Sequence, residues 1–332
     1  MWYSAVGFLV ILTLGLLTAP LAAEAQPPAK VPRIGLLLPE SPPATSVPSP
    51  VVQGLRDLGY VEGQHIAFVY RYAEGNLDRL PDLASELVRL SVDLLVASGV
   101  AAALAAKHAT TTIPIVFFGA TDPVGRGLVA SLARPGGNIT GVAFDGGPEI
   151  FGKRLELLKE AVPTVSRVAI LSGNARAPTY EAGEKVQESA ARALGLTLQY
   201  FYTQRREAFT EWVFPAITAD AHAIDALHVG GPAANDYRRQ IADFALQHRL
   251  PTIGVNRPLA EAGGLLSYGP NQRAMWQRAV VLVGKILQGA TPADLPVEQP
   301  MKFDLVINLK TAKALGITIP PLLLFQADEV IQ

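Results

Sequence analysis

Small and hydrogen-bonding residues follow two apolar segments whose composition is typical of buried strands. Ser98 and Gly99 come directly after the first segment, and Asp122 follows the second within a Thr-Asp-Pro-Val-Gly turn. In an open α/β sheet, the carboxyl ends of parallel strands form the crevice where ligands bind. The two segments carry no activated nucleophile, metal cage or phosphate loop. These residues therefore favour holding a small molecule over transforming it.

Asp122 and Ser98 each have two roles open to them. With Pro123 beside it, Asp122 is placed to cap the N-terminus of a following helix, and as a crevice carboxylate it can pair with a ligand ammonium group. These two roles do not exclude each other. Ser98 is either an N-cap serine or a donor to a ligand carboxylate, beside the free backbone N–H groups of an expected helix at 100–107.

Three residues in the second half of the chain occupy similar positions. Asn174 comes after an expected strand at 168–171, and Asn256 and Tyr268 lie at later strand ends. For each of them a turn or packing role is the simpler interpretation, and a ligand contact is the alternative. Tyr268 or Phe144 would offer an apolar wall to a ligand.

Other motifs are weaker. Residues 125–130 match G-x-G-x-x-A, with Asp145 at the spacing of a ribose-binding acid, but the run follows the fourth strand instead of the first. We interpret it as a tight strand-to-helix turn. The five histidines lack metal-site spacing, and no G-x-S-x-G occurs. We therefore expect no metal, no cofactor and no catalytic residue, and a protein that is not an enzyme.

Strand and helix patterns alternate along the chain in two arrays. Strands are expected at 33–38, 65–70, 92–97 and 113–118, then at 168–171, 198–202, 226–229 and 251–255, with a last strand-helix unit at 303–315. Helices are expected at 51–58, 78–90, 100–107, 153–161, 179–194, 209–218, 236–248 and 272–287. The alternation predicts an α/β fold with two doubly wound parallel-sheet lobes joined by a hinge. We expect residues 32–146 and about 265–300 in the N-terminal lobe, and 147–264 and about 301–332 in the C-terminal lobe.

Composition agrees with two lobes of ordinary size. The chain has 332 residues, 49% of them hydrophobic, so a substantial core is available. The formal net charge of −1 argues against a nucleic-acid partner, because such proteins usually carry a basic excess. The absence of cysteine excludes disulfides, thiolate nucleophiles and a lipid anchor on cysteine.

The N-terminus predicts export to the periplasm. An apolar run from Ala5 to Leu17 precedes an A-x-A cleavage pattern at residues 23–25, so we expect a signal peptide over residues 1–25. No Lys or Arg precedes the apolar run. A retained membrane anchor is therefore the alternative.

Seven segments have the order and spacing of a known family: 55–64, 93–107, 111–116, 122–141, 152–163, 262–270 and 293–319. Through them the chain resembles bacterial ABC-transporter substrate-binding proteins of the group associated with tryptophan and tyrosine uptake. The resemblance implies two lobes of the periplasmic-binding-protein type I kind that close over a small ligand. It also implies docking on an ABC permease of the inner membrane, and we expect the protein itself to be a monomer.

The resemblance also guides the choice of ligand-binding residues. We expect them to be Ser41, Ser98, Gly99, Asp122, Phe144, Asn174, Asn256 and Tyr268. The chain departs from its relatives where Gly99-Val100-Ala101 replaces Gly-Thr-Pro, and where residues 228–232 supply no carboxylate. We therefore expect the ligand to be an amino acid or a related small molecule. A ligand-sensing module for a membrane signalling protein and a doubly wound enzyme are the alternatives.

Overall fold

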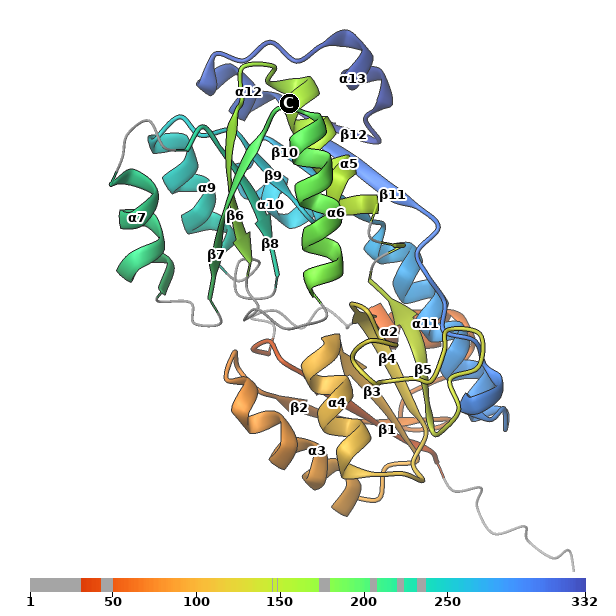
Figure 1. Ribbon diagram of the computed structural model, residues 1–332. Helices are drawn as coiled ribbons and strands as arrows, with labels where there is room; N and C mark the ends of the chain where they lie inside the picture. Colours follow the sequence, from red (N-terminus) through yellow and green to blue (C-terminus); the bar gives the residue numbers. More distant parts are fainter. Residues whose placement is uncertain are drawn as a thin grey trace, which may run out of the picture. The chain divides into compact units, whose positions relative to one another are not determined.

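The computed structural model describes residues 31–42, 50–144, 146–147, 149–172, 180–203, 208–219, 224–231 and 237–332 (Figure 1). The expected signal peptide at 1–25 and the candidate residue Asn174 lie outside the described residues. In the part that is described, two α/β units, here called the first and second lobe, are each built on one sheet.

Five parallel strands form the sheet of the first lobe, in the order β2-β1-β3-β4-β5. They are β1 (Arg33–Leu38), β2 (Ala67–Tyr72), β3 (Leu94–Ser98), β4 (Ile115–Ala120) and β5 (Ile139–Ala143). Four were expected from their apolar runs, whereas β5 was not. Successive side chains of a strand point to opposite faces. Leu36 accordingly joins one apolar cluster and Leu37 the other.

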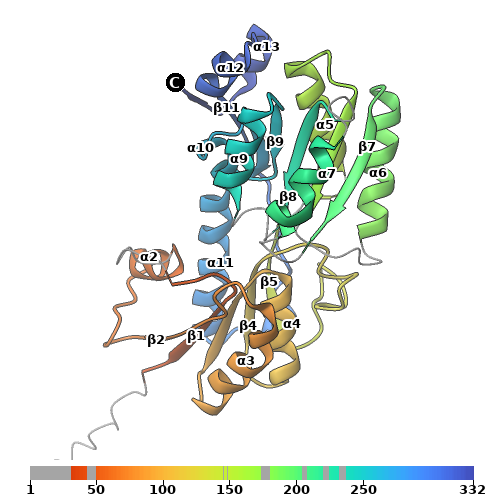
Figure 2. The same ribbon diagram turned by 90° about the vertical axis from the view of Figure 1, so that its left-hand side faces the viewer.

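Helices cover both faces of the first sheet (Figure 2). One face carries α3 (Leu80–Arg89), preceded by a 3₁₀ turn at Leu77–Arg79, and α4 (Gly99–Ala109). The other carries α2 (Pro50–Asp57) and α11 (Gln272–Leu287). The α11 helix comes from far along the chain and packs through Met275, Ala279 and Val283.

Seven strands form the sheet of the second lobe, in the order β12-β11-β10-β9-β8-β6-β7. They are β6 (Arg167–Ser172), β7 (Thr197–Tyr202), β8 (Ala226–Gly230), β9 (Thr252–Gly254), β10 (Leu266–Pro270), β11 (Phe303–Asn308) and β12 (Glu329–Ile331). All neighbours are parallel except β10 and β11, which are antiparallel. The sheet is therefore dominated by parallel pairs without being wholly parallel.

The second sheet also lies between two helical layers (Figure 1). One face packs against α5 (Glu149–Ala161), α6 (Tyr180–Ala193), α12 (Leu309–Leu315) and α13 (Pro321–Gln326). The other packs against α7 (Phe214–Thr218) with the π-helical turn Phe209–Val213 before it, α9 (Arg238–Gln247) and α10 (Arg257–Glu261).

The chain passes between the two sheets three times. It does so after β5, after β10, and between a short 3₁₀ helix (Pro292–Asp294) and β11. Before the last passage, Glu298 forms a parallel bridge with Val142, next to β5. Because β10 pairs with β9 and β11, it belongs to the second sheet. The boundary expected near residue 265 is therefore displaced to the end of β10, at Pro270.

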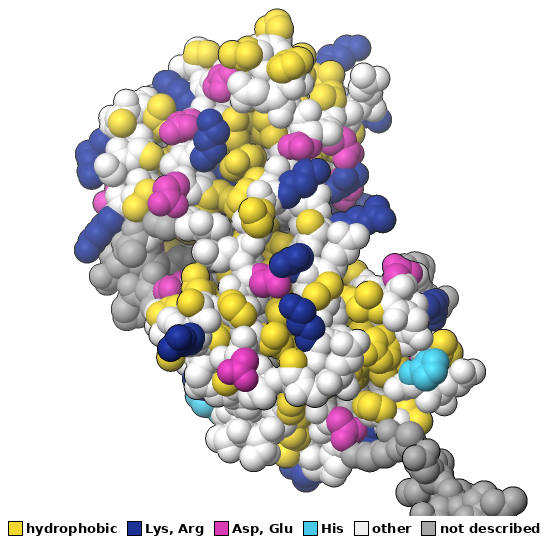
Figure 3. Space-filling model, turned by 90° about the vertical axis from the view of Figure 1, so that its right-hand side faces the viewer, with side chains coloured by type: hydrophobic (Ala, Val, Ile, Leu, Met, Phe, Trp, Pro, Cys, Tyr) yellow, Lys and Arg dark blue, Asp and Glu magenta, His cyan; other side chains and the backbone are white. Residues whose placement is uncertain are grey.

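Part of the apolar surface remains uncovered. Leu322 and Phe325 of α13 are 63% and 88% exposed, and Figure 3 shows hydrophobic side chains at the upper end of the face it draws, where Figure 1 places α13. Among the described residues, no helix is both long enough and apolar enough to cross a membrane.

Candidate functional site

Ser98 and Gly99 end β3 and begin α4. Ser98 occupies the N-cap position with an extended backbone, but its side chain makes no capping hydrogen bond. Gly99 has a φ of +77°, in the left-handed region that glycine adopts without strain. The first turn of α4 therefore carries backbone N–H groups that the Ser98 side chain does not occupy. Such groups attract anions at a helix N-terminus.

Asp122 does not cap a helix, contrary to one of its expected roles. Its φ is +45°, and its Oδ1 accepts a hydrogen bond of 3.0 Å from the N–H of Gly125. A Cβ placed on Gly125 would lie 2.2 Å from Oδ2. The carboxylate therefore folds back over a tight turn. A non-glycine residue in the left-handed region is strained, and such residues cluster at functional sites.

The expected strand-to-helix turn at residues 125–130 is also wrong, since turns and bends continue from there to β5. Gly127 and Gly136 have positive φ, and Pro135 lies between them. Glycine and proline disfavour a helix interior. With no helix after it, this segment lacks the helix N-terminus on which a dinucleotide fingerprint depends. Asp145, the acid at the matching spacing, lies outside the described residues.

Aromatic rings gather at the carboxyl end of β4. Phe118 of β4 stacks on Trp276 of α11, with ring centroids 3.6 Å apart and planes inclined by 12°. Phe144, just after β5, packs against the same apolar cluster. The pairing of β4 with β5 shifts register between Phe118 and Ala120, where Gly119 has a φ of +71°. Bulges of this kind redirect side chains next to binding sites.

Trp276 was not among the residues expected at the site. No local pattern in the sequence around Trp276 links it to a residue of β4. Only the packing of α11 on the first sheet brings the two rings together.

Ser41 follows β1 and is exposed. Tyr72, the last residue of β2, is paired with Leu38, the last residue of β1. Burial, and secondarily the Glu40 carboxylate, raise the pKa of the Tyr72 hydroxyl. The rings of Tyr70 and Tyr72 are parallel, with centroids 6.1 Å apart. The end of β1 thus lies beside a neutral tyrosine pair that the sequence pattern had not singled out.

In the second lobe, Asn256 and Tyr268 occupy different settings. Asn256 precedes α10 in the N-cap position, without a side-chain capping bond. Tyr268 lies in the middle of β10 instead of at its end, and its ring is 5.8 Å from that of Phe303. Its carbonyl oxygen accepts a hydrogen bond of 2.8 Å from Nε of Arg154.

Two buried polar residues of the second lobe were missed. Arg154 of α5 and His228 of β8 are only 2% and 3% exposed. Burial and then the Arg154 charge lower the pKa of His228 to about 3, so the imidazole is neutral. Neither of its ring nitrogens has a hydrogen-bond partner within the described ranges. An unpaired buried polar group costs about 1–3 kcal/mol.

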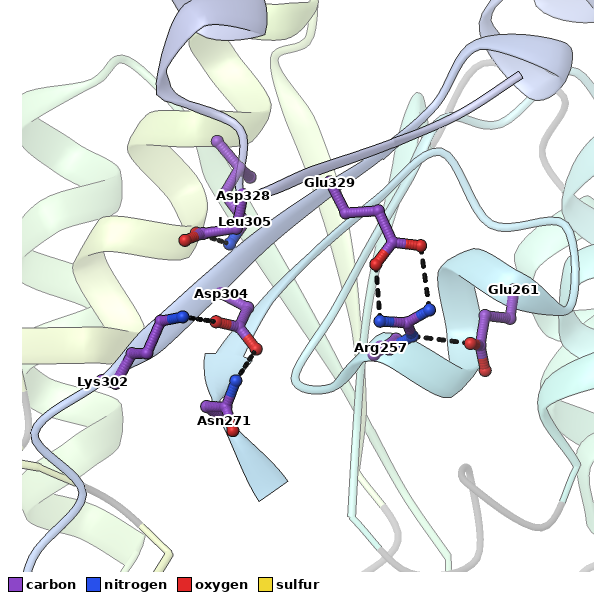
Figure 4. Close-up of polar contacts among 8 residues, drawn as sticks. All are labelled: Arg257, Glu261, Asn271, Lys302, Asp304, Leu305, Asp328 and Glu329. Carbon is purple, nitrogen blue, oxygen red and sulfur yellow. Dashed lines mark hydrogen bonds and ion pairs between the residues drawn. The ribbon is translucent and has the colours of Figure 1, made fainter. Parts of the chain in front are cut away.

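One polar network joins α10 to β12, and another joins the end of β10 to β11 (Figure 4). Arg257, beside Asn256, donates from Nε to Glu261 at 2.6 Å, and its two other nitrogens meet the carboxylate of Glu329. The hydrogen bond to Glu261, with both carboxylate charges, raises the pKa of Arg257. Separately, Nδ2 of Asn271 donates to Oδ2 of Asp304 at 2.7 Å.

The groups at the strand ends suit the binding of a small molecule. Over the described part of the chain, no three His, Asp or Glu side chains are arranged to hold a metal ion. The strand ends instead supply backbone N–H groups, a carboxylate and aromatic rings. These are the few polar groups and apolar walls that small-molecule sites combine.

A family model for ABC transporter substrate-binding proteins matches residues 40–331. The chain belongs to this family. It is 28% identical over 271 residues to a tyrosine-binding protein of Clostridioides difficile (strain R20291). The matched region covers 80% of this chain and 74% of the relative.

Two solved structures resemble the substrate-binding protein closely. One is a conserved domain protein from Vibrio cholerae, with 27% identity, a TM-score of 0.80, and coverage of 91% of this chain and all of that one. The other is an ABC domain from Streptococcus pneumonia in complex with L-Trp, with 28% identity and a TM-score of 0.79 over 90% and 99% of the two chains. The two sheets with their helical layers are therefore the lobes of a periplasmic-binding-protein type I fold.

Proposed function

We propose that this substrate-binding protein captures an amino acid with an aromatic side chain in the periplasm and delivers it to an ABC permease of the inner membrane. Family membership supports capture of a solute for an ABC transporter. The stack of Trp276 on Phe118 beside the strand ends of the first sheet supports an aromatic ligand, because an aromatic ring packs well against other aromatic rings.

The first lobe would hold the amino acid head group. The N–H groups at the start of α4, with the Ser98 hydroxyl and the Gly99 backbone, would receive the ligand carboxylate. The Asp122 carboxylate would pair with the ligand ammonium group, and Phe144 would line the apolar side. Ser41 would close the site from the loop after β1.

The second lobe would complete the site with Asn174, Asn256 and Tyr268. A ligand shifts a protein toward the closed form only if it binds that form more tightly. Contacts made by the second lobe would supply this difference, and the closed form would dock on the permease. The protein would act as a monomer and leave the covalent bonds of the ligand unchanged.

Titration calorimetry with the mature chain would test this proposal. We expect L-tryptophan or L-tyrosine to bind, and 3-(indol-3-yl)propanoic acid, which lacks the amine, to bind at least tenfold more weakly. Asp122→Asn keeps an acceptor for the Gly125 N–H but removes the charge. We expect it to weaken amino acid binding by more than about 1.5 kcal/mol, the low end for a charged hydrogen bond.

Two results would contradict the proposal. If no aromatic amino acid binds, or raises the melting temperature as a bound ligand must, the ligand class is wrong. If mass spectrometry finds a new product after incubation with the ligand, the protein transforms what it binds. Unchanged affinity of a folded Asp122→Asn variant would remove Asp122 from the site alone.

A further inference from the structure

His228 lies near the carboxyl end of the second sheet, on the face covered by α5 and α6. It is paired with Ile170 of β6 on one side and Ile253 of β9 on the other, and both belong to the apolar cluster on that face. After burial, the charge of the Arg154 guanidinium on α5 is the next cause that lowers the pKa of His228. An imidazole with both nitrogens unpaired inside such a cluster is unfavourable, so its presence there needs an explanation.

The neighbours of the imidazole along the two strands are small residues. Gly230 is two residues further along β8, on the same face, and a Cβ placed there would come within 3.9 Å of Cε1 of His228. In the register of the sheet, Gly230 is paired with Ser172, another small residue. Among the described residues, the side chain nearest to this position is that of Val255, whose Cγ1 would lie 3.1 Å from the added Cβ.

A second unpaired polar group lies on the same face. Gln187 of α6 is 3% exposed, and its Nε2 has no hydrogen-bond partner among the described residues. Its Oε1 accepts from the Tyr200 hydroxyl at 3.5 Å. Tyr200 and His228 are both paired with Ile170, from opposite sides of β6. Gln187 is thus linked, through Tyr200, to the strand that lies on the other side of Ile170 from His228.

The chemistry of this pair matches a hydroxyl group. A neutral imidazole has one N–H donor and one bare nitrogen acceptor, and a hydroxyl can both accept and donate. The amide N–H of Gln187 adds a donor, and the nearby Arg154 charge favours a ligand oxygen. A carboxylate would leave the bare imidazole nitrogen unpaired, because it can only accept.

We propose that His228 and Gln187, beside Arg154, form a second-lobe subsite that binds a hydroxyl group at the far end of the ligand. This inference rests on the proposed function, in which the first lobe holds the head group. His228 would then be a specificity-determining residue that favours a phenol over an unsubstituted phenyl ring. A site built to hydrogen-bond a hydroxyl strongly rejects the analogue that lacks it.

The test compares L-tyrosine with L-phenylalanine by titration calorimetry on the full-length protein. We expect the wild-type protein to bind L-tyrosine at least tenfold more tightly than L-phenylalanine. In His228→Leu we expect the ratio of the two dissociation constants to fall below threefold, while the affinity for L-phenylalanine stays within threefold of wild type. The ratio within one variant separates loss of selectivity from a general loss of binding.

Two further variants sharpen the test. Gly230→Ala keeps both polar groups and adds a methyl group 3.9 Å from Cε1 of His228 and 3.1 Å from Cγ1 of Val255. We expect it to lower the affinity for L-tyrosine more than that for L-phenylalanine. His108→Leu removes an exposed histidine of α4 and should leave the ratio unchanged. If His228→Leu folds poorly, the ratio of the two dissociation constants in Gly230→Ala tests the subsite instead, and an unchanged ratio would overturn it.

The possible failures are distinct. A wild-type protein that binds both amino acids equally, or a His228→Leu variant that keeps the tenfold ratio, would overturn the subsite and leave the proposed function standing. A wild-type protein that binds no aromatic amino acid would overturn both.

Discussion

The indole ring of Trp276 lies flat against the ring of Phe118, with centroids 3.6 Å apart. Trp276 lies on α11 and Phe118 on β4, so the contact joins two elements that are far apart in the sequence. The stack is part of the apolar face through which α11 packs on the first sheet, although β10 before it and β11 after it belong to the second.

Removing this stack should destabilise the protein and weaken the binding of an aromatic ligand. Because Trp276 is only half-buried, we expect Trp276→Ala to lower the free energy of unfolding by about 2 kcal/mol, below the 3–5 kcal/mol typical of fully buried Trp. Trp276→Phe keeps a ring on Phe118 and should lose less than half as much. Urea denaturation of both variants checks this, and equal losses would show that ring stacking contributes nothing.

Asn271 joins the chain segments on either side of α11. Its Nδ2 donates to Asp304 (Figure 4). Its Oδ1 accepts from the N–H of Ala274, and its backbone N–H donates to the carbonyl of Lys302 at 2.9 Å. We expect Asn271→Ala to cost about 1–2 kcal/mol of unfolding free energy, since it removes the N-cap of α11 and a partner of Asp304.

Asn271→Ser separates these two effects, because serine also caps helices but is too short to replace the amide donor to Asp304. We expect it to recover at least half of the loss in thermal or urea unfolding. A serine variant as unstable as the alanine variant would show that the bond to Asp304 dominates.

The buried His228 should make the protein sensitive to acid. Its pKa is lowered from 6.5 to about 3 in the folded state, so the unfolded chain binds the proton first as pH falls. Stability from this group is complete above pH 6.5 and declines below it, by roughly 3 kcal/mol between pH 7 and pH 4. In His228→Leu this decline should disappear from urea unfolding curves.

His108→Leu serves as the control for acid sensitivity, because His108 is exposed. It should keep the wild-type dependence of stability on pH. A His228→Leu variant with the same dependence as wild type would mean that the imidazole is protonated in the folded protein without a large cost.

The turn after β4 depends on the absence of a side chain at position 125. In Gly125→Ala the new Cβ would meet the Asp122 carboxylate at 2.2 Å, so the carboxylate must move and lose its bond to the residue 125 N–H. We expect the variant to lose about 1 kcal/mol of stability or more, and to bind the amino acid ligand more weakly.

Gly137→Ala is the matched control, because a Cβ there would meet nothing within 4 Å and its φ is not positive. It should be neutral, or slightly stabilising through the unfolded state. Calorimetric melting of the two variants, with and without ligand, provides the comparison. Equal behaviour would mean that the Asp122 turn has no special role.

The local pattern of apolar residues was enough to place most strands and helices. The runs at β1, β3 and β4 and the Leu spacing of α3 depend on burial of neighbouring residues, which is visible within a few positions. The same pattern failed at β5, because Ile139-Thr140-Gly141 is short and contains glycine. It also failed after Asp122, where a folded-back carboxylate replaces the expected helix cap.

Amino-acid order alone thus established an α/β chain with ligand-type residues after its strands, since strand formation and burial follow a short-range period. Long-range packing settled the rest: that β10 joins the second sheet, that Trp276 meets Phe118, and that His228 stands unpaired near Arg154. These relationships join residues far apart along the chain. Their energies arise only once the sheets are assembled, so no local pattern records them.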